Sequence, residues 1–352
     1  MTLIISNMKK HLSIILIATF GLGPVWAGNP DRVGSAGAGQ LLINPWAASN
    51  GLAGANMASI LGLEATYNNV AGLAFIKKNE IATANSQYLG GSGISINTVG
   101  FGTRVGSSSV LGLTVTSLSF GDIPVTTEDL PEGGIGTFSP AFSNIGISMA
   151  KEFSNSIYAG FTLRIVSESI SNVKATGVSF DAGIRYITGE DDRMRFGIAL
   201  RNVGAPMRYA GDGLTVTATP QGSAGSLTML QRSERYELPS LVNIGIAYDV
   251  VKTDNMAIEM NGQFTSNSFT RDQFGLCTEA RFGTYLALRA GYLIESGLSS
   301  NDDAASAYTG PSGGIGFQIP AGSNGSVIAV DYSYRTTNPF SGTHAVGLKI
   351  TI

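Results

Sequence analysis

From about residue 80 to the end of the chain, apolar and polar positions alternate in stretches of roughly ten residues, separated by Gly, Ser, Asn and Asp. Between residues 157 and 166, for example, Phe161 and Leu163 alternate with Thr162 and Arg164. A period of two indicates a β-strand whose two faces meet different surroundings. Many such strands in succession are typical of a membrane barrel, in which lipid-facing and lumen-facing residues alternate.

Fourteen segments carry this pattern, although the first two keep the alternation poorly. An even number of strands suits a closed barrel made of one chain. The predicted strands lie near 80–88, 93–105, 109–118, 142–153, 156–168, 176–188, 193–203, 241–251, 255–265, 273–282, 284–294, 312–319, 326–336 and 343–352.

The connections between these segments test the prediction independently, because outer-membrane barrels have short periplasmic turns and longer outer loops. If the first strand rises from the periplasm, each connection from an even to an odd strand should be short. These connections fall at 106–108, 154–155, 189–192, 252–254, 283 and 320–325. The longest connections, 119–141, 204–240 and 295–311, all run from odd to even strands. This rhythm favours a barrel over the alternatives, a soluble β-sandwich or β-helix.

Composition agrees with a sheet that faces lipid. Only 13% of the 352 residues are charged, 46 are Gly, and the mean hydropathy is +0.17. Yet no internal run reaches the roughly 18 apolar residues of a membrane helix. Since only helices and closed barrels can span lipid, we predict an all-β fold, a transmembrane antiparallel β-barrel of about 14 strands. The net charge of −3 gives no reason to expect nucleic-acid binding.

The first 27 residues are typical of a signal peptide. Lys9 and Lys10 precede an apolar stretch over 12–22, and a cleavage site follows between Ala27 and Gly28. The alternative is a retained membrane anchor, but the apolar stretch is short for that and is broken by Gly and Pro. We therefore predict export, with the cell outer membrane as the destination and its lipid as the surroundings.

The segment 28–78 differs from the barrel segment 79–352, because it is rich in Gly, Ala and Asn and shows no strand alternation. We expect it to fill the barrel as a plug, as wider barrels are often filled by their own segments. The alternative is a flexible periplasmic tail. Apolar residues such as Leu41, Trp46 and Leu63 argue against disorder.

No catalytic or metal-binding set of residues emerges from the sequence. The chain has two histidines, His11 and His344, and one cysteine, Cys277. Removal of the signal peptide would also remove His11. A Cys-His pair would then need Cys277 and His344, with nothing else to support it, and one histidine is too few for a histidine metal site. We therefore predict that the protein is not an enzyme and has no cofactor.

The predicted lumen face carries charges of both signs. A salt-bridged interior that stiffens the wall or holds the plug is one interpretation, and a polar channel is the other. A lumen of about fourteen strands is too wide for its own wall side chains to fill, so a plug, a ligand or water must occupy it. The predicted lumen residues are Arg164, Glu168, Asp181, Arg185, Arg201, Glu259, Glu279 and Arg281, together with Arg193, Arg195, Asp331, Arg335 and Lys349.

The connection 204–240 holds residues of the types that are favoured at protein interfaces, namely Arg and aromatic residues. They are Arg208, Tyr209, Arg232, Arg235 and Tyr236. One interpretation is a surface that binds a partner protein, and the other is simple packing of the loop over the barrel mouth.

Four stretches resemble the PorV/PorQ family of Bacteroidetes outer-membrane proteins: QLLINPWAASNGLAGAN at 40–56, EATYNNVAGLA at 64–74, FDAG at 180–183 and GIALRNVG at 197–204. The second is similar to the family's Tyr-x-Asn-Pro-Ala-Gly-Leu-Ala box, with Val70 in place of the usual Pro. The resemblance extends over nearly the whole chain after the signal peptide, and the change at Val70 puts the subfamily in doubt.

The resemblance implies a fatty-acid-transporter-like barrel with an N-terminal plug that serves type IX protein secretion or cell-surface attachment. The implied partners are other outer-membrane proteins, a translocon, and the C-terminal domains of secreted cargo. Two other functions are open: uptake of small hydrophobic molecules, and structural support of another outer-membrane complex, including gliding machinery. Uptake predicts a continuous apolar path, which the charged lumen face weakens. Secretion predicts a firmly plugged barrel with working outer loops.

Overall fold

The computed structural model describes residues 32–222, 224–296, 306–321 and 325–352. The predicted signal peptide, with its cleavage site at Ala27 and Gly28, lies outside the described residues. Within the described part of the chain, no helix is both long and apolar enough to cross a membrane.

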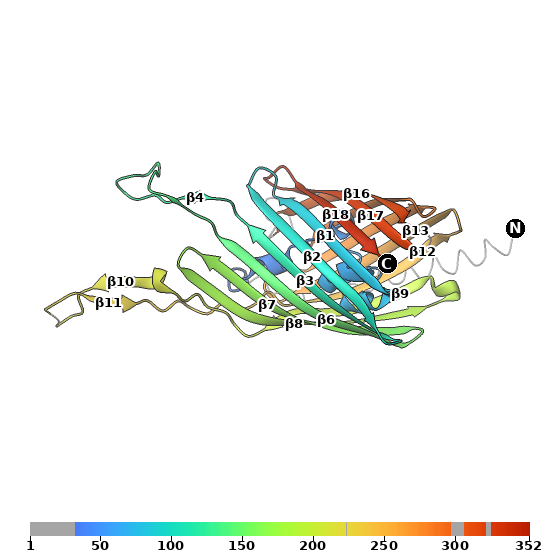
Figure 1. Ribbon diagram of the computed structural model, residues 1–352, viewed down its shortest axis with the longest axis horizontal. Helices are drawn as coiled ribbons and strands as arrows, with labels where there is room; N and C mark the ends of the chain where they lie inside the picture. Colours follow the sequence, from blue (N-terminus) through green and yellow to red (C-terminus); the bar gives the residue numbers. More distant parts are fainter. Residues whose placement is uncertain (1–31, 223, 297–305, 322–324) are drawn as a thin grey trace.

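Fourteen long strands form one closed antiparallel barrel, which confirms the predicted fold class. Each strand pairs with its neighbours along the chain, and β1 closes the barrel by pairing with both β2 and β18 (Figure 1). The strands are β1 (Asn79–Tyr88), β2 (Ile94–Val105), β3 (Ser109–Ser119), β6 (Ala141–Ser154), β7 (Ile157–Ile170), β8 (Val173–Thr188), β9 (Met194–Gly204), β12 (Leu241–Lys252), β13 (Met256–Asn267), β14 (Gln273–Phe282), β15 (Leu286–Glu295), β16 (Tyr308–Ala321), β17 (Ser326–Thr337) and β18 (Thr343–Thr351).

The outer wall of the barrel is largely apolar, and it explains the sequence pattern. Phe161, Leu163 and Ile184 are exposed on it, while the residues between them are mostly buried in the lumen. The first two strands alternate in burial as regularly as the others. Their pattern is weak in the sequence because polar side chains also face outward there. Asn85, for instance, donates to the Asn97 amide oxygen across the β1–β2 pair at 2.7 Å.

Two of the three long connections contain hairpins of their own. The connection after β3 forms β4 (Ile123–Pro124) and β5 (Thr137–Phe138). The connection after β9 forms η6 (Asp212–Leu214), β10 (Thr215–Ala218) and β11 (Leu227–Leu230). Both hairpins extend from the same end of the barrel (Figure 1), which we call the outer end because the long connections lie there. The short η5 (Glu190–Asp192) lies in the turn between β8 and β9.

Residues 39–76, called the plug below, lie inside the barrel as a series of short helical turns (Figure 1). These are η2 (Gly39–Leu42), α2 (Ala47–Gly51), η3 (Gly62–Glu64), α3 (Ala65–Asn68) and η4 (Val70–Phe75). Leu63, Leu73 and Ile76 are fully buried in a cluster with residues of the wall. Burial of each such side chain is worth roughly 1.5–3 kcal/mol, so the plug is bound firmly to the wall.

Glycines of the wall let the plug approach the strands closely. A methyl group added at Gly183 would lie 2.2 Å from the Asn69 side-chain oxygen, and one at Gly291 would lie 2.5 Å from the Leu52 carbonyl carbon. Asn69 in turn accepts a hydrogen bond from the Ala71 backbone N–H and so caps η4. These wall positions therefore need glycine because the backbone or a capping side chain of the plug occupies the space of a Cβ.

Candidate functional site

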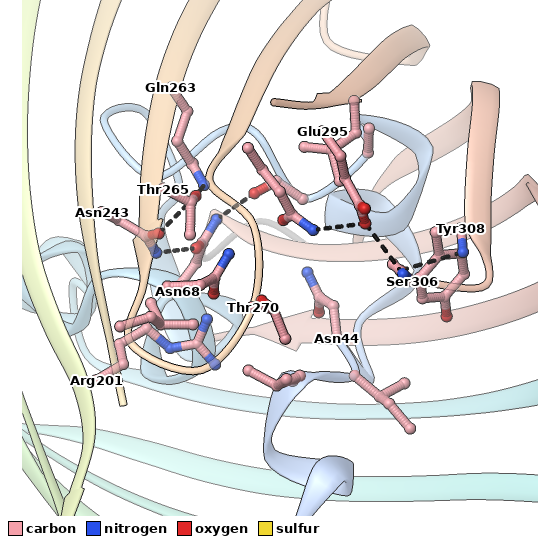
Figure 2. Close-up of a pocket in the computed structure, with 18 of the residues that line it drawn as sticks. Asn44, Asn68, Arg201, Asn243, Gln263, Thr265, Thr270, Glu295, Ser306 and Tyr308 are labelled. Atoms are coloured by element: carbon pink, nitrogen blue, oxygen red, sulfur yellow. Dashed lines mark hydrogen bonds between the residues drawn. The ribbon is translucent and has the colours of Figure 1, made fainter. Parts of the chain in front are cut away.

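A cavity of about 240 Å³ lies between the plug and the outer half of the wall (Figure 2). Its wall comes from the outer ends of β1, β9, β12, β13, β14, β15, β16 and β17, and its floor from the plug. Most lining side chains are amides, hydroxyls or aromatic rings. They include Asn44, Tyr67, Asn68, Tyr88, Arg201, Asn243, Gln263, Thr265, Asn267, Thr270, Gln273, Glu295, Ser306, Tyr308 and Arg335.

A chain of side-chain hydrogen bonds holds one side of the cavity in place. Gln263 donates to the Thr265 hydroxyl at 3.1 Å, and Thr265 donates to the Asn243 amide oxygen at 2.8 Å. Asn243 then donates to Asn68 of the plug at 3.3 Å, and Asn68 donates to the Gly54 carbonyl at 2.8 Å (Figure 2). Wall and floor therefore form one connected polar surface, in which each amide has its orientation fixed by a neighbour.

The only carboxylate that lines the cavity among the described residues is Glu295. It accepts hydrogen bonds from the Gln273 amide at 3.3 Å and from the Ser306 backbone N–H at 3.1 Å. Because it already has donors from the wall and from the connection after β15, this carboxylate helps to hold the cavity rim.

A β-bulge at the outer end of β9 turns Asn202 into the lumen beside Arg201, which already faces inward in phase with Gly197 and Ala199. Phe180 pairs with Val203 and Ala182 with Leu200, so Asp181 faces two residues of β9, Arg201 and Asn202. Asn202 adopts a φ of 59°, in the left-handed region that Asn tolerates better than most residues. Both Arg201 and Asn202 are consequently buried in the lumen, although strict alternation would send one of them to the outer wall.

Asp181 and Arg164 stabilise the bulge through hydrogen bonds to Asn202 and through an ion pair with each other. Asp181 accepts a hydrogen bond from the Asn202 backbone N–H at 2.7 Å, and its second oxygen lies 2.9 Å from Arg164. Arg164 also donates to the Asn202 side chain at 3.3 Å. The predicted lumen residues Arg164 and Asp181 thus form a buried ion pair beneath the cavity wall.

Two buried arginines line the cavity without a carboxylate partner. The Cζ of Arg201 lies 4.0 Å from the centroid of the Tyr67 ring, and one of its nitrogens donates to the Leu41 carbonyl at 3.1 Å. The Cζ of Arg335 lies 3.8 Å from the centroid of the Tyr308 ring. Neither guanidinium has an acidic side chain within 4.0 Å in the described part of the chain.

A second cavity, of about 350 Å³, lies on the other side of the plug segment 37–43 and has mainly apolar walls. Phe120, Phe142 and Leu118 contribute to it, together with Tyr209 and Tyr236 of the connection 205–240. The buried Glu168 closes one end. It accepts hydrogen bonds from Tyr209 at 2.6 Å, from Tyr236 at 2.7 Å and from Gln40 of the plug at 2.9 Å.

The five residues proposed for partner binding therefore divide into two groups. Arg208, Arg232 and Arg235 are exposed on the outer connection. Tyr209 and Tyr236 point inward, and the pKa of each hydroxyl lies above the usual value of 10.0 because of burial and the bond to Glu168. The two tyrosines close the loop over the barrel mouth, which leaves the arginines as the part of this set that an outside partner can reach.

Most of the remaining predicted lumen residues make ion pairs inside the barrel or contacts with the plug. Arg193 does not, since it lies in the turn before β9 and 3.7 Å from Asp191 of that turn. Arg195 pairs with Asp249 and with Glu259, the latter at 3.0 Å. Glu279 lies 2.6 Å from Arg289 and 3.4 Å from Arg281.

Plug and wall also meet through charged groups. Arg185 is fully buried, donates to the Ile60 carbonyl of the plug and lies over the Phe75 ring. Lys349 lies 3.5 Å from Glu64 of the plug. Burial raises the pKa of the Glu64 carboxyl above its usual value, and the nearby Lys349 opposes that rise.

Sequence reasoning listed Arg201 and Arg335 as lumen residues but missed the amide wall between them. The signal was present, since Asn243, Gln263 and Thr265 all occupy lumen positions near the outer ends of their strands. The plug residues Asn44, Tyr67 and Asn68 carry no periodic signal. Among the described residues, no three His, Cys, Asp or Glu side chains cluster so that they could hold a metal ion.

Comparison with known proteins identifies the fold class. No protein-family model matches the sequence, and no curated protein does. The solved structure of the CymD monoaromatic hydrocarbon channel is similar, with a TM-score of 0.52 and 14% identity over 92% of this chain and 97% of that one. The Pseudomonas putida toluene transporter TodX gives a TM-score of 0.55 with 12% identity, over 88% of this chain and 97% of that one.

A Pseudomonas aeruginosa FadL homologue gives a TM-score of 0.51 and 13% identity, over 86% of this chain and 96% of that one. The chain therefore has the fold of the FadL-like outer-membrane barrels, two of which are named as a hydrocarbon channel and a toluene transporter. The finer resemblance to the PorV/PorQ proteins stays a prediction.

Proposed function

We propose that this protein is an outer-membrane uptake channel, which binds a small solute in the polar cavity and releases it inward when the plug shifts. The observation that carries the proposal is the 240 Å³ cavity enclosed by the outer half of a closed barrel and floored by the plug. Binding sites for small molecules are concave, with a few oriented polar groups, and this cavity has that form. The shared fold with hydrocarbon channels supports transport as the general activity.

The plug blocks the inner half of the lumen in this structure. Trp46, Leu63 and Ile76 belong to a buried apolar cluster with wall residues, so solute passage requires the plug to move. A plug tied to the wall should therefore stop transport, and this consequence gives the experiment.

A disulfide between plug and wall is the direct test. A Cβ built at Gly347 of β18 would lie 3.2 Å from the Cβ of Ala47, slightly under the roughly 3.5–4.5 Å that a disulfide spans. The variant Ala47→Cys/Gly347→Cys should therefore crosslink after a small shift. Purified protein is reconstituted in liposomes, and uptake of labelled gluconate, glucose and octanoate is measured before and after reduction.

Uptake of at least one solute by the reduced variant and the parent protein, and its loss on oxidation, is the expected result. The single variants Ala47→Cys and Gly347→Cys, which like the double variant keep the native Cys277, serve as controls and should transport in both states. Equal uptake by the oxidised and the reduced double variant would contradict plug movement. If liposomes that contain the parent protein take up none of the three solutes, the uptake proposal is wrong.

A second candidate function rests on the hairpin β10–β11, which extends beyond the outer end of the barrel (Figure 1). Leu227, Met229 and Leu230 are exposed on β11, and Leu230 is 68% exposed. Exposed apolar groups gathered on one element often mark an interaction site. This feature favours the secretion interpretation, in which a translocon or a cargo domain docks at the outer loops.

Affinity purification from native outer membranes tests this second function. The tagged parent protein should recover a large translocon barrel or secreted proteins with a shared C-terminal domain. The variant Leu227→Ser/Met229→Ser/Leu230→Ser and the variant Arg232→Ala/Arg235→Ala should lose them, while both keep Tyr236 and therefore the loop closure. Recovery of the parent barrel alone would reject partner binding.

A further inference from the structure

Among the described residues, the side chains that line the polar cavity carry more positive than negative charge. Arg201 and Arg335 line it, against the single carboxylate of Glu295 among the described residues. Arg335 is only 7% exposed and Arg201 only 5%. Buried charges in proteins are normally paired, because an unpaired ion loses its hydration without compensation.

Arg335 is the clearer of the two cases. Its guanidinium makes no hydrogen bond and no ion pair within the described part of the chain, and it lies over the face of the Tyr308 ring. A guanidinium has five N–H donors in a planar fork that fits a carboxylate, and a ring face satisfies none of them. The side chain is therefore held in position by stacking while its donors stay free for a ligand.

Arg201 is partly satisfied. One nitrogen donates to the Leu41 carbonyl at 3.1 Å, while its Nε is buried and has no partner. Figure 2 shows Arg201 and Tyr308 on opposite sides of the cavity, with Asn44, Asn68 and Thr270 between them. Because Arg335 stacks on Tyr308, the two guanidinium groups lie toward opposite sides of one polar space.

The surface between the arginines is made of amides and hydroxyls. Asn68, Asn243 and Gln263 are held in place by hydrogen bonds to one another, to Thr265 and to the plug backbone. Such a surface offers donors and acceptors in fixed directions, which suit hydroxyl groups and leave a hydrocarbon chain with unpaired polar neighbours. The volume of about 240 Å³ lies below the range that drug-sized ligands occupy, so the ligand is small.

We propose that the cavity binds a small hydroxylated organic anion, with its acid group on Arg335, its hydroxyls on the amide wall, and Arg201 as a second positive contact. The inference deepens the proposed uptake function, because it names the chemical class of the solute. It differs from what the hydrocarbon-channel fold alone would suggest, since two arginines and a set of amides line this cavity beside apolar residues such as Leu42, Leu241 and Leu293.

Binding to the purified full chain in detergent tests the proposal by isothermal titration calorimetry. Gluconate is the probe, glucose is its neutral match in size and hydroxyl pattern, and octanoate is an acid with an apolar chain. The variants are Arg335→Gln and Arg335→Lys, with the exposed Arg232→Gln as the matched control. Heat-modified gel migration and circular dichroism show whether each variant forms the barrel.

Gluconate should bind saturably, glucose at least tenfold more weakly, and octanoate not at all. Arg335→Gln should weaken gluconate binding about tenfold or more, because a hydrogen-bonded charge pair is lost. Arg335→Lys should retain part of the affinity and Arg232→Gln all of it. If Arg335→Gln does not form the barrel, the test rests on two other measurements. These are the gluconate affinity of Arg335→Lys and the ratio of the gluconate affinity to the glucose affinity of the parent protein.

Equal binding of gluconate and glucose would overturn the role of the arginines, and preferential binding of octanoate would overturn the polar ligand. Absence of binding by all three probes would overturn the site. The proposed uptake function can be wrong even if this inference is right. If gluconate binds to the protein but does not enter the liposomes, the binding site is supported and transport is rejected.

Discussion

The Glu168 carboxylate in β7 accepts a hydrogen bond at 2.7 Å from the hydroxyl of Tyr236, which lies 68 residues further along the chain. Tyr209 donates to the same carboxylate oxygen at 2.6 Å, and Gln40 of the plug donates to the other at 2.9 Å. One buried acid of the wall thus joins the outer connection and the plug. A plug movement that leads to transport must therefore either break these hydrogen bonds or move Glu168 and the outer connection together with the plug.

Replacement of Glu168 by Leu should release the outer connection. The change removes the acceptor of both tyrosines and of Gln40, and one hydrogen bond to a charged group is worth about 1.5–3 kcal/mol. Limited proteolysis within 205–240 should therefore become roughly tenfold faster or more. Glu234→Leu, an exposed change in the same connection, is the control, and equal rates for the two variants would contradict the junction.

The same junction should weaken at high pH. Burial and the bond to Glu168 raise the pKa values of Tyr209 and Tyr236 above the usual 10.0, so the closed connection binds their protons more tightly than the released one. The stabilisation is therefore complete below pH 10 and falls as the pH rises through the raised values. Proteolysis of the connection should accelerate in that range, and the Tyr209→Phe/Tyr236→Phe variant should show no such pH dependence.

The ion pairs of the lumen should differ greatly in their contribution to stability. Arg289 lies 2.6 Å from both Glu279 and Asp331, and its side chain is 7% exposed. Arg289→Ala removes the ion-pair partner of the buried Asp331 and leaves Glu279 with only the more exposed Arg281, so it should lower the free energy of unfolding by about 3–5 kcal/mol. Arg281 also pairs with Glu279, at 3.4 Å, but its side chain is 39% exposed, so Arg281→Ala should cost at most about 1 kcal/mol.

Urea unfolding of both variants in phospholipid bilayers measures this difference. Similar losses for Arg289→Ala and Arg281→Ala would show that the buried cluster does not stabilise the barrel as the geometry suggests.

Enlargement of Gly291 should dislodge the plug. A Cβ there would lie 2.5 Å from the Leu52 carbonyl carbon and 2.8 Å from the Ala53 nitrogen, so the backbone of the plug must move away from β15. We expect Gly291→Val to raise the ion conductance of single barrels in planar bilayers. Gly262→Val is the control, because its nearest neighbours are side-chain carbons at 3.7 Å. An unchanged conductance of Gly291→Val would show that the plug accommodates the change without opening.

The sequence by itself determined the number, order and approximate bounds of the barrel strands. Alternation with a period of two depends only on which face of a strand meets lipid, and connection lengths depend on local chain geometry, so both are visible without tertiary contacts. The largest error in a strand start is at β16, which begins at Tyr308 rather than near 312, beyond an irregularity in its pairing with β17. A local disturbance of the ladder leaves little trace in residue type.

The tertiary structure alone decided the site. Alternation already places Arg201 on the lumen face, but only the bulge brings Asn202 in beside it. Arg335 is held at the cavity by stacking on Tyr308 of the neighbouring strand. Tyr236 holds the loop closed through Glu168, a contact between residues far apart in sequence. The plug has no periodicity to read, since its short turns are shaped by glycine-lined space on the wall. Periodicity reports which side of a strand faces lipid, whereas the position of a side chain within the lumen depends on closure of the whole barrel.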